Sequence, residues 1–253
     1  FGVSGGPAAL TDLAARGRRF DVRDEAAALA ISRAEGGLLA LGRLTTTFQA
    51  NAVVNAATFT SGIAPGGLFA VFGSGLAGTP DTQVELGGTP ARVIFRSPFQ
   101  LNAEAPPGLA PGIHPLRITS AFGIAEASVE VQSLAPVIFP IGDPAAGVGA
   151  VTDEGGTLNS IASPNLRGRP IVVYGTGLGA VVPAGAFSVA REPVEVLISD
   201  RLLAPLFAGL TPGFIGLYQV NVVIPADFPP GLDLPLQLKQ GRFESNVVRV
   251  AIR

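Results

Sequence analysis

The chain of 253 residues contains no cysteine, methionine or tryptophan, and only one lysine and one histidine. Without cysteine there is no disulfide and no thiolate metal ligand. The single histidine, His114, excludes sites built from several imidazoles and leaves a Ser-His-Asp triad only formally open. Because a chain without methionine does not contain its own initiator, we expect a mature product from which a secretory signal before Phe1 was removed. The expected location is therefore extracellular, at the cell surface.

Charge is also scarce. Charged residues make up 14% of the chain, against roughly 25% in ordinary soluble domains, and the net charge is −2. Neutralising phosphates requires clustered cations, and only Arg16, Arg18 and Arg19 form a cluster. Nucleic acid is therefore not expected as a partner. Gly, Pro, Asn and Thr interrupt the longest uncharged run, residues 44–80, so no membrane span is expected.

What the chain does contain is an internal repeat. Residues 65–76 read PGGLFAVFGSGL, and residues 170–178 read PIVVYGTGL. Further along, Gln100–Asn102 matches Gln219–Asn221 in the same order. A repeat of this length indicates that one structural unit occurs twice.

The repeated unit has the features of a β-sandwich. The 33 glycines and 22 prolines fall between short apolar runs, where the turns of an all-β chain belong. The expected strands are 67–73, 83–87, 91–96, 99–104, 113–120, 125–132, 170–175, 193–199, 202–207, 217–224, 234–239 and 246–252. This spacing predicts an all-β fold of two tandem immunoglobulin-like β-sandwiches preceded by an N-terminal arm. The predicted boundaries are 1–48 for the arm, 49–133 for sandwich 1 and 134–253 for sandwich 2.

Two stretches lengthen the second copy, and both are expected to be loops. Residues 179–191 are rich in Gly, Pro and Val, and residues 206–217 read LFAGLTPGFIGL. The second stretch either offers an apolar contact surface or folds back over one end of its sandwich.

The arm has no counterpart in the repeat. Its apolar residues alternate with small ones on both sides of Gly36-Gly37, as in a β-hairpin, although residues 24–33 also suit a helix. We favour a strand for 38–48 and leave 24–33 open. A strand donated to the next subunit would give these side chains a place to be buried. The residues expected at such an interface are Leu29, Ile31, Leu39, Leu41, Leu44 and Phe48.

Motifs for chemistry are weak. Gly175-Thr176-Gly177-Leu178-Gly179 lacks the spacing and the following helix of a nucleotide loop, and is expected to be a turn at the end of a strand. Asp153-Glu154 could contact calcium, but a solvated turn is the simpler interpretation. Asn102 and Asn221 are expected to alternate with core residues or to bond the backbone at a bulge. No catalytic residue, cofactor site or metal ligand is expected, and the chain is predicted not to be an enzyme.

Several of these segments together resemble a known family. The segments VNAATF (54–59), SPFQLNAEAP (97–106), FAGLTPGFIGLYQVN (207–221) and SNVVRVAI (245–252) are similar to the Solibacter-type C-terminal tandem domain of secreted acidobacterial proteins. The resemblance runs from about residue 50 to the end. It implies a secreted pair of immunoglobulin-like or IPT/TIG-like sandwiches and no catalytic residues.

These observations predict a structural protein of the cell surface. In the leading interpretation the chain is the subunit of a filament whose partners are copies of itself, joined head to tail by strand donation from the arm. In the alternative, the two sandwiches form a monomeric binding module that recognises a surface glycan or protein. The scarcity of tyrosine and the absence of tryptophan weakly disfavour a carbohydrate site.

Overall fold

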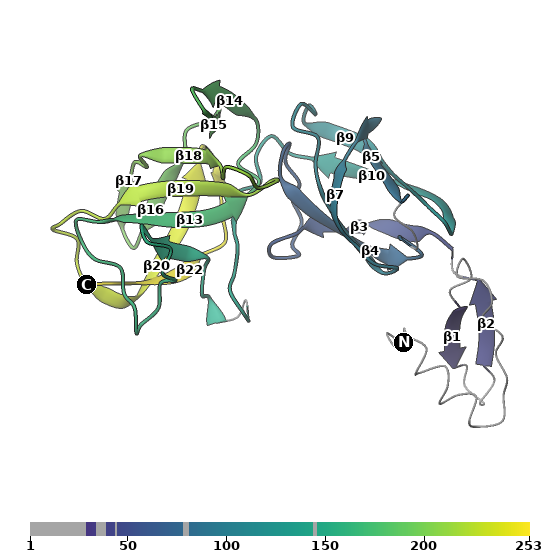
Figure 1. The fold of residues 1–253 in the computed structure, drawn as a ribbon, viewed down its shortest axis with the longest axis horizontal. Helices are drawn as coiled ribbons and strands as arrows, with labels where there is room; N and C mark the ends of the chain where they lie inside the picture. Colours follow the sequence, from purple (N-terminus) through teal and green to yellow (C-terminus); the bar gives the residue numbers. More distant parts are fainter. Residues whose placement is uncertain (1–28, 34–38, 44, 78–80, 144–145) are drawn as a thin grey trace.

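Two β-sandwiches lie side by side in the computed structural model (Figure 1), which describes residues 29–33, 39–43, 45–77, 81–143 and 146–253, the first two segments by backbone alone. The described residues form antiparallel sheets and contain no α-helix. The prediction of two tandem immunoglobulin-like β-sandwiches is confirmed.

Sandwich 1 consists of two four-stranded sheets, β3-β4-β8-β7 and β10-β9-β5-β6. The strands of the first sheet are β3 (Thr47–Asn55), β4 (Leu68–Ser74), β7 (Arg92–Arg96) and β8 (Gln100–Glu104). Those of the second are β5 (Gln83–Leu86), β6 (Thr89–Pro90), β9 (Gly112–Ser120) and β10 (Gly123–Val131). In β8 the side chains alternate between the core and the outer face, as the two-residue period of a strand requires, whereas β3 and β7 each contain an irregularity in register.

Sandwich 2 has a larger sheet in the order β11-β13-β19-β18-β15-β14, with β12 also pairing with β13. Its strands are β11 (Val137–Ile138), β12 (Val151–Asp153), β13 (Pro170–Thr176), β14 (Val181–Ala184), β15 (Phe187–Ala190), β18 (Phe207–Leu210) and β19 (Tyr218–Val223). The opposing sheet contains β16 (Glu195–Ile198), β17 (Arg201–Leu203), β20 (Gly231–Gln240), β21 (Phe243–Glu244) and β22 (Val248–Ile252). The segments expected as loops, 179–191 and 206–217, thus contribute β14, β15 and β18.

Each sandwich has a closed core of its own. In sandwich 1 the fully buried side chains include Phe69, Leu86, Leu101, Leu116 and Ile118. In sandwich 2 the corresponding core includes Ile138, Ile171, Leu178, Ile198, Tyr218, Val222, Phe228 and Leu236. The two clusters are separate, so each repeat buries enough apolar surface to form a core without the other.

The glycines of the repeated motif allow the chain to enter each sandwich. A Cβ on Gly73 would lie 2.2 Å from the carbonyl oxygen of Thr47, and one on Gly177 would lie 1.9 Å from that of Ala135. Gly177 also has a φ of +77°, which favours glycine. The motif is therefore a turn at the end of a strand, packed against the backbone of the incoming chain, and its interpretation as a structural turn is confirmed.

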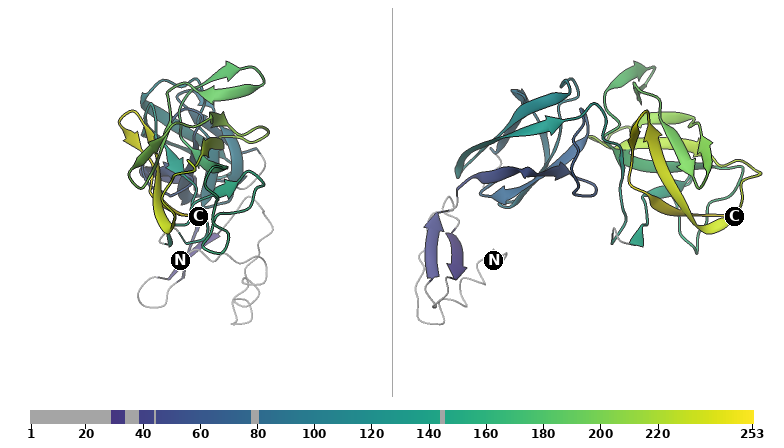
Figure 2. Two further views of the ribbon diagram at one scale, coloured as in Figure 1. Left: turned by 90° about the vertical axis from the view of Figure 1, so that its left-hand side faces the viewer. Right: turned by 180° about the vertical axis from the view of Figure 1, so that it is seen from behind.

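The arm contains a hairpin. Strands β1 (Leu29–Arg33) and β2 (Leu39–Arg43) pair antiparallel with each other and form a two-stranded sheet separate from the sheets of both sandwiches (Figures 1 and 2). Of the two possibilities for 24–33, the structure shows a strand for the described residues 29–33.

Candidate functional site

The outer face of one sheet of sandwich 1 carries two aromatic rings and two amides. Leu101 and Ala103 of β8 point into the core, so their neighbours Gln100 and Asn102 point outward. Phe72 of β4 pairs with Gln100, and Phe95 of β7 pairs with Asn102. The two amides thus lie on the central strand β8, and the rings flank them on the strands to either side, each level with a different amide. We call Phe72, Phe95, Gln100 and Asn102 platform 1.

Sandwich 2 repeats this arrangement. Val220 and Val222 of β19 are buried, so Gln219 and Asn221 point outward. Tyr174 of β13 pairs with Gln219, and Phe207 of β18 pairs with Asn221. We call Tyr174, Phe207, Gln219 and Asn221 platform 2.

The amides within each platform bond to each other. Gln100 Nε2 donates to Asn102 Oδ1 at 2.9 Å, and Gln219 Nε2 donates to Asn221 Oδ1 at 3.4 Å. Each bond leaves the glutamine Oε1 as an acceptor and the asparagine Nδ2 as a donor for another partner. The platforms therefore present one fixed donor and one fixed acceptor between two rings.

A second aromatic side chain supports one ring of each platform. Phe59 meets Phe72 edge to face with centroids 5.4 Å apart, and Phe187 meets Phe207 in the same way at 5.7 Å. Phe72 and Phe95 remain 37% and 47% exposed, although residues of this type are usually buried. Neither ring is needed to fill the core, so its position on the surface calls for another explanation.

The two platforms lie on the same side of the molecule. Thr176 belongs to the outward-pointing set of β13, as Tyr174 does, and its Oγ1 accepts a hydrogen bond from the backbone N–H of Leu68 at 2.8 Å. Glu104 belongs to the outward-pointing set of β8 and accepts a hydrogen bond from the backbone N–H of Gly216. Thr176 of sandwich 2 thus bonds to sandwich 1, and Glu104 of sandwich 1 bonds to sandwich 2. Because both side chains belong to the outer faces of their sheets, these two faces meet at the junction.

The junction is closely packed. Thr176 Oγ1 also donates to the carbonyl oxygen of Gly216 at 2.8 Å, and the Tyr218 hydroxyl donates to that of Gly179 at 2.6 Å. A Cβ on Gly66 would lie 2.8 Å from the Tyr218 hydroxyl, and one on Gly216 would lie 2.5 Å from a methyl group of Leu68. Contact this close holds the two sandwiches in one relative orientation.

The polar groups of the junction have shifted pKa values. Burial raises the pKa of the Glu104 carboxyl, although nearby Arg92 and the hydrogen bond from Gly216 partly offset the shift. Burial also raises the pKa of the Tyr218 hydroxyl, and the negative charge of Glu104 adds to this effect. Tyr218 therefore remains a hydrogen-bond donor throughout the physiological pH range.

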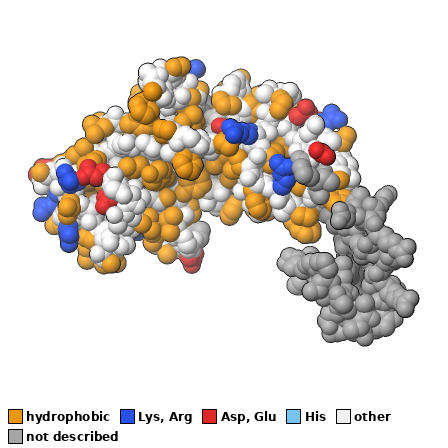
Figure 3. Space-filling view, viewed as in Figure 1, with side chains coloured by type: hydrophobic (Ala, Val, Ile, Leu, Met, Phe, Trp, Pro, Cys, Tyr) orange, Lys and Arg blue, Asp and Glu red, His pale blue; other side chains and the backbone are white. Residues whose placement is uncertain are grey.

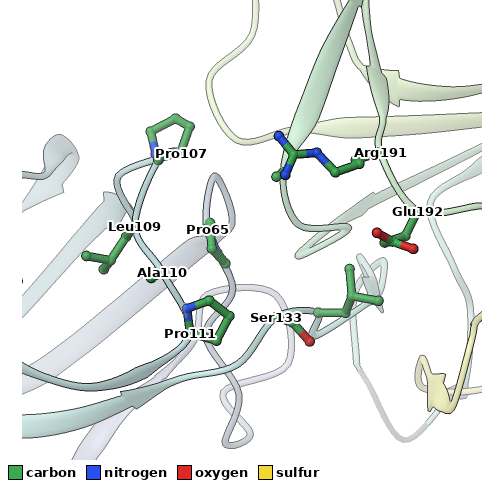
Figure 4. Close-up of a pocket in the computed structure, with 11 residues that line it drawn as sticks. Pro65, Pro107, Leu109, Ala110, Pro111, Ser133, Arg191 and Glu192 are labelled. Carbon is green, nitrogen blue, oxygen red and sulfur yellow. The ribbon is translucent and has the colours of Figure 1, made fainter.

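A groove of about 470 Å³ lies between the sandwiches (Figure 4). Pro65, Pro107, Leu109 and Pro111 of sandwich 1 line one side. The charged residues Arg191 and Glu192 of sandwich 2 line the other. The groove has no counterpart in the repeat, and it presents one cation and one carboxylate from adjacent residues. It is a weaker candidate than the platforms.

The residues tested for chemistry have structural roles. His114 Nε2 lies 2.8 Å from the carbonyl oxygen of Ala110 and ties down the loop that lines the groove. Asp153 Oδ1 accepts hydrogen bonds from the N–H groups of Gly155 and Thr157, which lower the pKa of Asp153, as in a solvated turn. Its neighbour Glu154 forms an ion pair with Arg169 at 2.7 Å. The residues that the structure describes contain no cluster of three or more His, Asp or Glu that could hold a metal.

The predicted interface residues of the arm fall in three places. Leu29, Ile31, Leu39 and Leu41 lie in the hairpin, and Leu44 lies outside the described residues. Phe48 belongs to β3, pairs with Gly73 and packs against the core of sandwich 1. Sandwich 1 thus begins before the predicted boundary at residue 49, because β3 already starts at Thr47. Nothing described here brings the hairpin residues together with either platform.

No protein-family model and no curated protein sequence matches the chain. Among solved structures it is similar to SGBP-B of a xyloglucan utilization locus in Bacteroides uniformis, at 12% identity and a TM-score of 0.30, covering 82% of this chain and 50% of that one. SGBP-B of the mixed-linkage glucan utilization locus of Bacteroides ovatus gives 13% identity and a TM-score of 0.36, covering 88% and 52%. The chain thus spans about half the length of these two proteins.

A third similar structure comprises domains 5–6 of the S-layer protein SbsC, at 14% identity and a TM-score of 0.33, covering 83% of this chain and 97% of that one. At these identities the likeness concerns the fold alone. What the chain binds must be argued from its own residues. Within the described residues, no helix has the length and apolar character needed to cross a bilayer.

Proposed function

We propose that the protein is a non-catalytic, extracellular binding module that recognises its ligand through platforms 1 and 2. The observation that carries the proposal is the repetition. The same two ring and two amide positions recur on solvent-facing sites of both sandwiches, where the packing of the core does not require them. Aromatic rings and side-chain amides are among the groups that position ligands in binding sites.

The space-filling view agrees with such a role. Hydrophobic side chains spread over the middle of the molecule. Charged side chains gather at the end of sandwich 2 that points away from sandwich 1, and smaller charged groups lie between the sandwiches and over sandwich 1 (Figure 3). The extracellular location rests on the resemblance to the secreted Solibacter-type family, which remains a prediction. The two Bacteroides proteins belong to utilization loci for xyloglucan and mixed-linkage glucan, which makes a glycan the first ligand class to test here.

The test compares the wild type with one quadruple variant and one double variant on arrays of glycans and surface proteins. The platform variant carries Phe72→Ala, Phe95→Ala, Tyr174→Ala and Phe207→Ala. The control carries Ile113→Ala and Leu202→Ala, which remove exposed apolar residues, 77% and 51% accessible, from the other sheet of each sandwich. A ligand that the wild type and the control retain and the platform variant loses supports the proposal. Equal binding by all three proteins contradicts it.

A filament subunit is the second candidate. It is favoured by the hairpin β1–β2, which forms a sheet of its own and has two edges available for strand addition. Strand donation into an incomplete sandwich is less favoured, because an acceptor lacking a strand would expose its core, and both described cores are closed.

The junction itself does not repeat along a filament. At the far end of sandwich 2, Arg169 and Pro170 occupy the positions of Gly67 and Leu68 in the repeat. Proline has no N–H to donate to a threonine hydroxyl. A Cβ at Gly67 would lie 3.1 Å from the Cα of Gly177, so the longer arginine has no room in the same contact. A polymer would therefore have to form through a different contact, and the arm is the one proposed here.

A further inference from the structure

The two platforms are linked through the junction by outward rows of residues. The row of β13 runs through Tyr174 and Thr176, and the row of β4 runs from Leu68 to Phe72. Thr176 and Leu68 are buried at the junction, so along these two rows the accessible side chains are the rings at either end. The neighbouring strands are linked in the same way. Gly216, three residues before Gln219 of β19, donates its N–H to Glu104 of β8. Asn102 and Gln100 lie on the same face of β8 as Glu104. In Figure 1, β13 points toward sandwich 1 and β4 leads away from the junction.

The separation of the platforms follows from strand geometry. Two residue steps separate Tyr174 from Thr176, and four separate Leu68 from Phe72. At about 3.3 Å per residue, the rings of Tyr174 and Phe72 are roughly 20–25 Å apart once the hydrogen bond at the junction is included. A ligand that contacts both platforms must therefore be extended.

The chemistry of the surface selects the class of ligand. Neither platform contains a charged side chain, and at the junction Arg92 pairs across strands with Glu104. A neutral sugar ring has an apolar C–H face that stacks on an aromatic ring and hydroxyls at its edge that both donate and accept hydrogen bonds. The rings on either side of the two amides offer both kinds of contact within each platform. A protein partner would instead have to bury the amides at the centre of its interface, where each needs a matched partner.

We propose that platforms 1 and 2 together bind one extended, neutral polysaccharide chain that crosses the junction between the sandwiches. This inference rests on the proposed function and adds the ligand class and the bivalent mode of binding. Because the junction fixes the spacing of the platforms, the second contact is intramolecular, and the affinity for a long chain exceeds that of either platform alone.

The test is calorimetry of the full chain with neutral oligosaccharides of two to ten sugar units, using cello-, manno- and dextran-derived series, and with alginate as a charged probe. For one series we expect the affinity to rise at least 10-fold once the oligosaccharide is long enough to span about 20–25 Å. Phe72→Ala/Phe95→Ala and Tyr174→Ala/Phe207→Ala should each abolish this rise and leave the affinity for the shortest binder within about twofold.

A second pair of variants repeats the test and leaves the rings in place: Gln100→Ala/Asn102→Ala and Gln219→Ala/Asn221→Ala. If a ring variant fails to fold, these amide variants still decide the result. Ile113→Ala/Leu202→Ala is the matched control. An affinity that does not depend on oligosaccharide length, or that is lost entirely when one platform is changed, overturns bivalent binding. The proposal that the protein is a binding module would still stand. Binding of alginate alone, or of a protein through the same side chains, overturns the ligand class. Glycan binding that no platform variant changes overturns both proposals.

Discussion

The Thr176 hydroxyl links the two sandwiches, because it accepts a hydrogen bond from the backbone N–H of Leu68 at 2.8 Å and donates one to the carbonyl of Gly216 at the same distance. The threonine is fully buried. A buried N–H that loses its acceptor has no water to replace it. The junction therefore depends on this hydroxyl.

Replacing Thr176 by valine should destabilise the protein by about 1–3 kcal/mol, because the shape is kept while two polar groups lose their partner. Urea unfolding measures the loss. Thr176→Ser retains the hydroxyl and should show the smaller change of the two. If valine is tolerated as well as serine, the bond does not hold the junction.

Replacing Gly177 by alanine should cost about 2–6 kcal/mol, because it combines a positive φ with a carbonyl oxygen 1.9 Å from the new Cβ. Gly185 is the matched control, since its φ is +62° and no atom lies within 4 Å of a new Cβ. Gly185→Ala should cost about 1–2 kcal/mol from the backbone conformation alone. Equal losses in thermal unfolding would show that the contact with Ala135 is unimportant.

Glu104 should make stability depend on pH. Its folded-state pKa is raised above the ordinary value of 4.5, so the folded state holds the proton more tightly than the unfolded state. The stabilisation of the folded state by this tighter proton binding is complete below pH 4.5, and it is lost as the pH rises through the folded-state pKa. Compared with the wild type, Glu104→Gln should lose less stability between acidic and neutral pH, measured by urea unfolding at a series of pH values. Parallel pH profiles would contradict this assignment.

Deleting residues 1–44 should leave folded two-sandwich monomers, because Thr46 and the residues after it already belong to sandwich 1. Thr46 Oγ1 donates to the carbonyl of Gly75 at 3.1 Å. If the wild type polymerises, light scattering and negative-stain microscopy should show that this deletion abolishes the fibres and that deletion of residues 1–28 alone, which keeps the hairpin, does not. Fibres formed by the 1–44 deletion would refute strand donation.

Much of the fold could be predicted from alternation and turn residues. The strands expected at 83–87, 170–175 and 217–224 correspond to β5, β13 and β19 with shifts of one residue at most. β14, β15 and β18 were missed, because Gly and Pro within a strand pattern favour turns. Val181–Ala184 lies at the edge of its sheet, where a proline without an N–H is tolerated.

Only part of the candidate site could be predicted from the sequence. Alignment of the repeat matches the Gln-x-Asn pairs and the aromatics Phe72 and Tyr174, but it does not match Phe95 with Phe207. Phe95 precedes Asn102 by seven residues, whereas Phe207 precedes Asn221 by fourteen, so only the strand register brings them to equivalent places. Nor does the repeat predict burial. Phe99 and Tyr218 are matched in sequence, yet Phe99 is 43% exposed, whereas Tyr218 is 1% exposed because it packs in the core of sandwich 2.

Hydroxyl-radical footprinting of the full chain, with and without a saturating ligand identified on the arrays, shows directly whether the ligand covers both platforms. We expect protection of Phe72, Phe95, Tyr174 and Phe207 together, with Ile113 and Leu202 unchanged as controls on the opposite sheets. Protection confined to the interdomain groove, at Pro107 and Arg191, would show that the platforms are not the binding site.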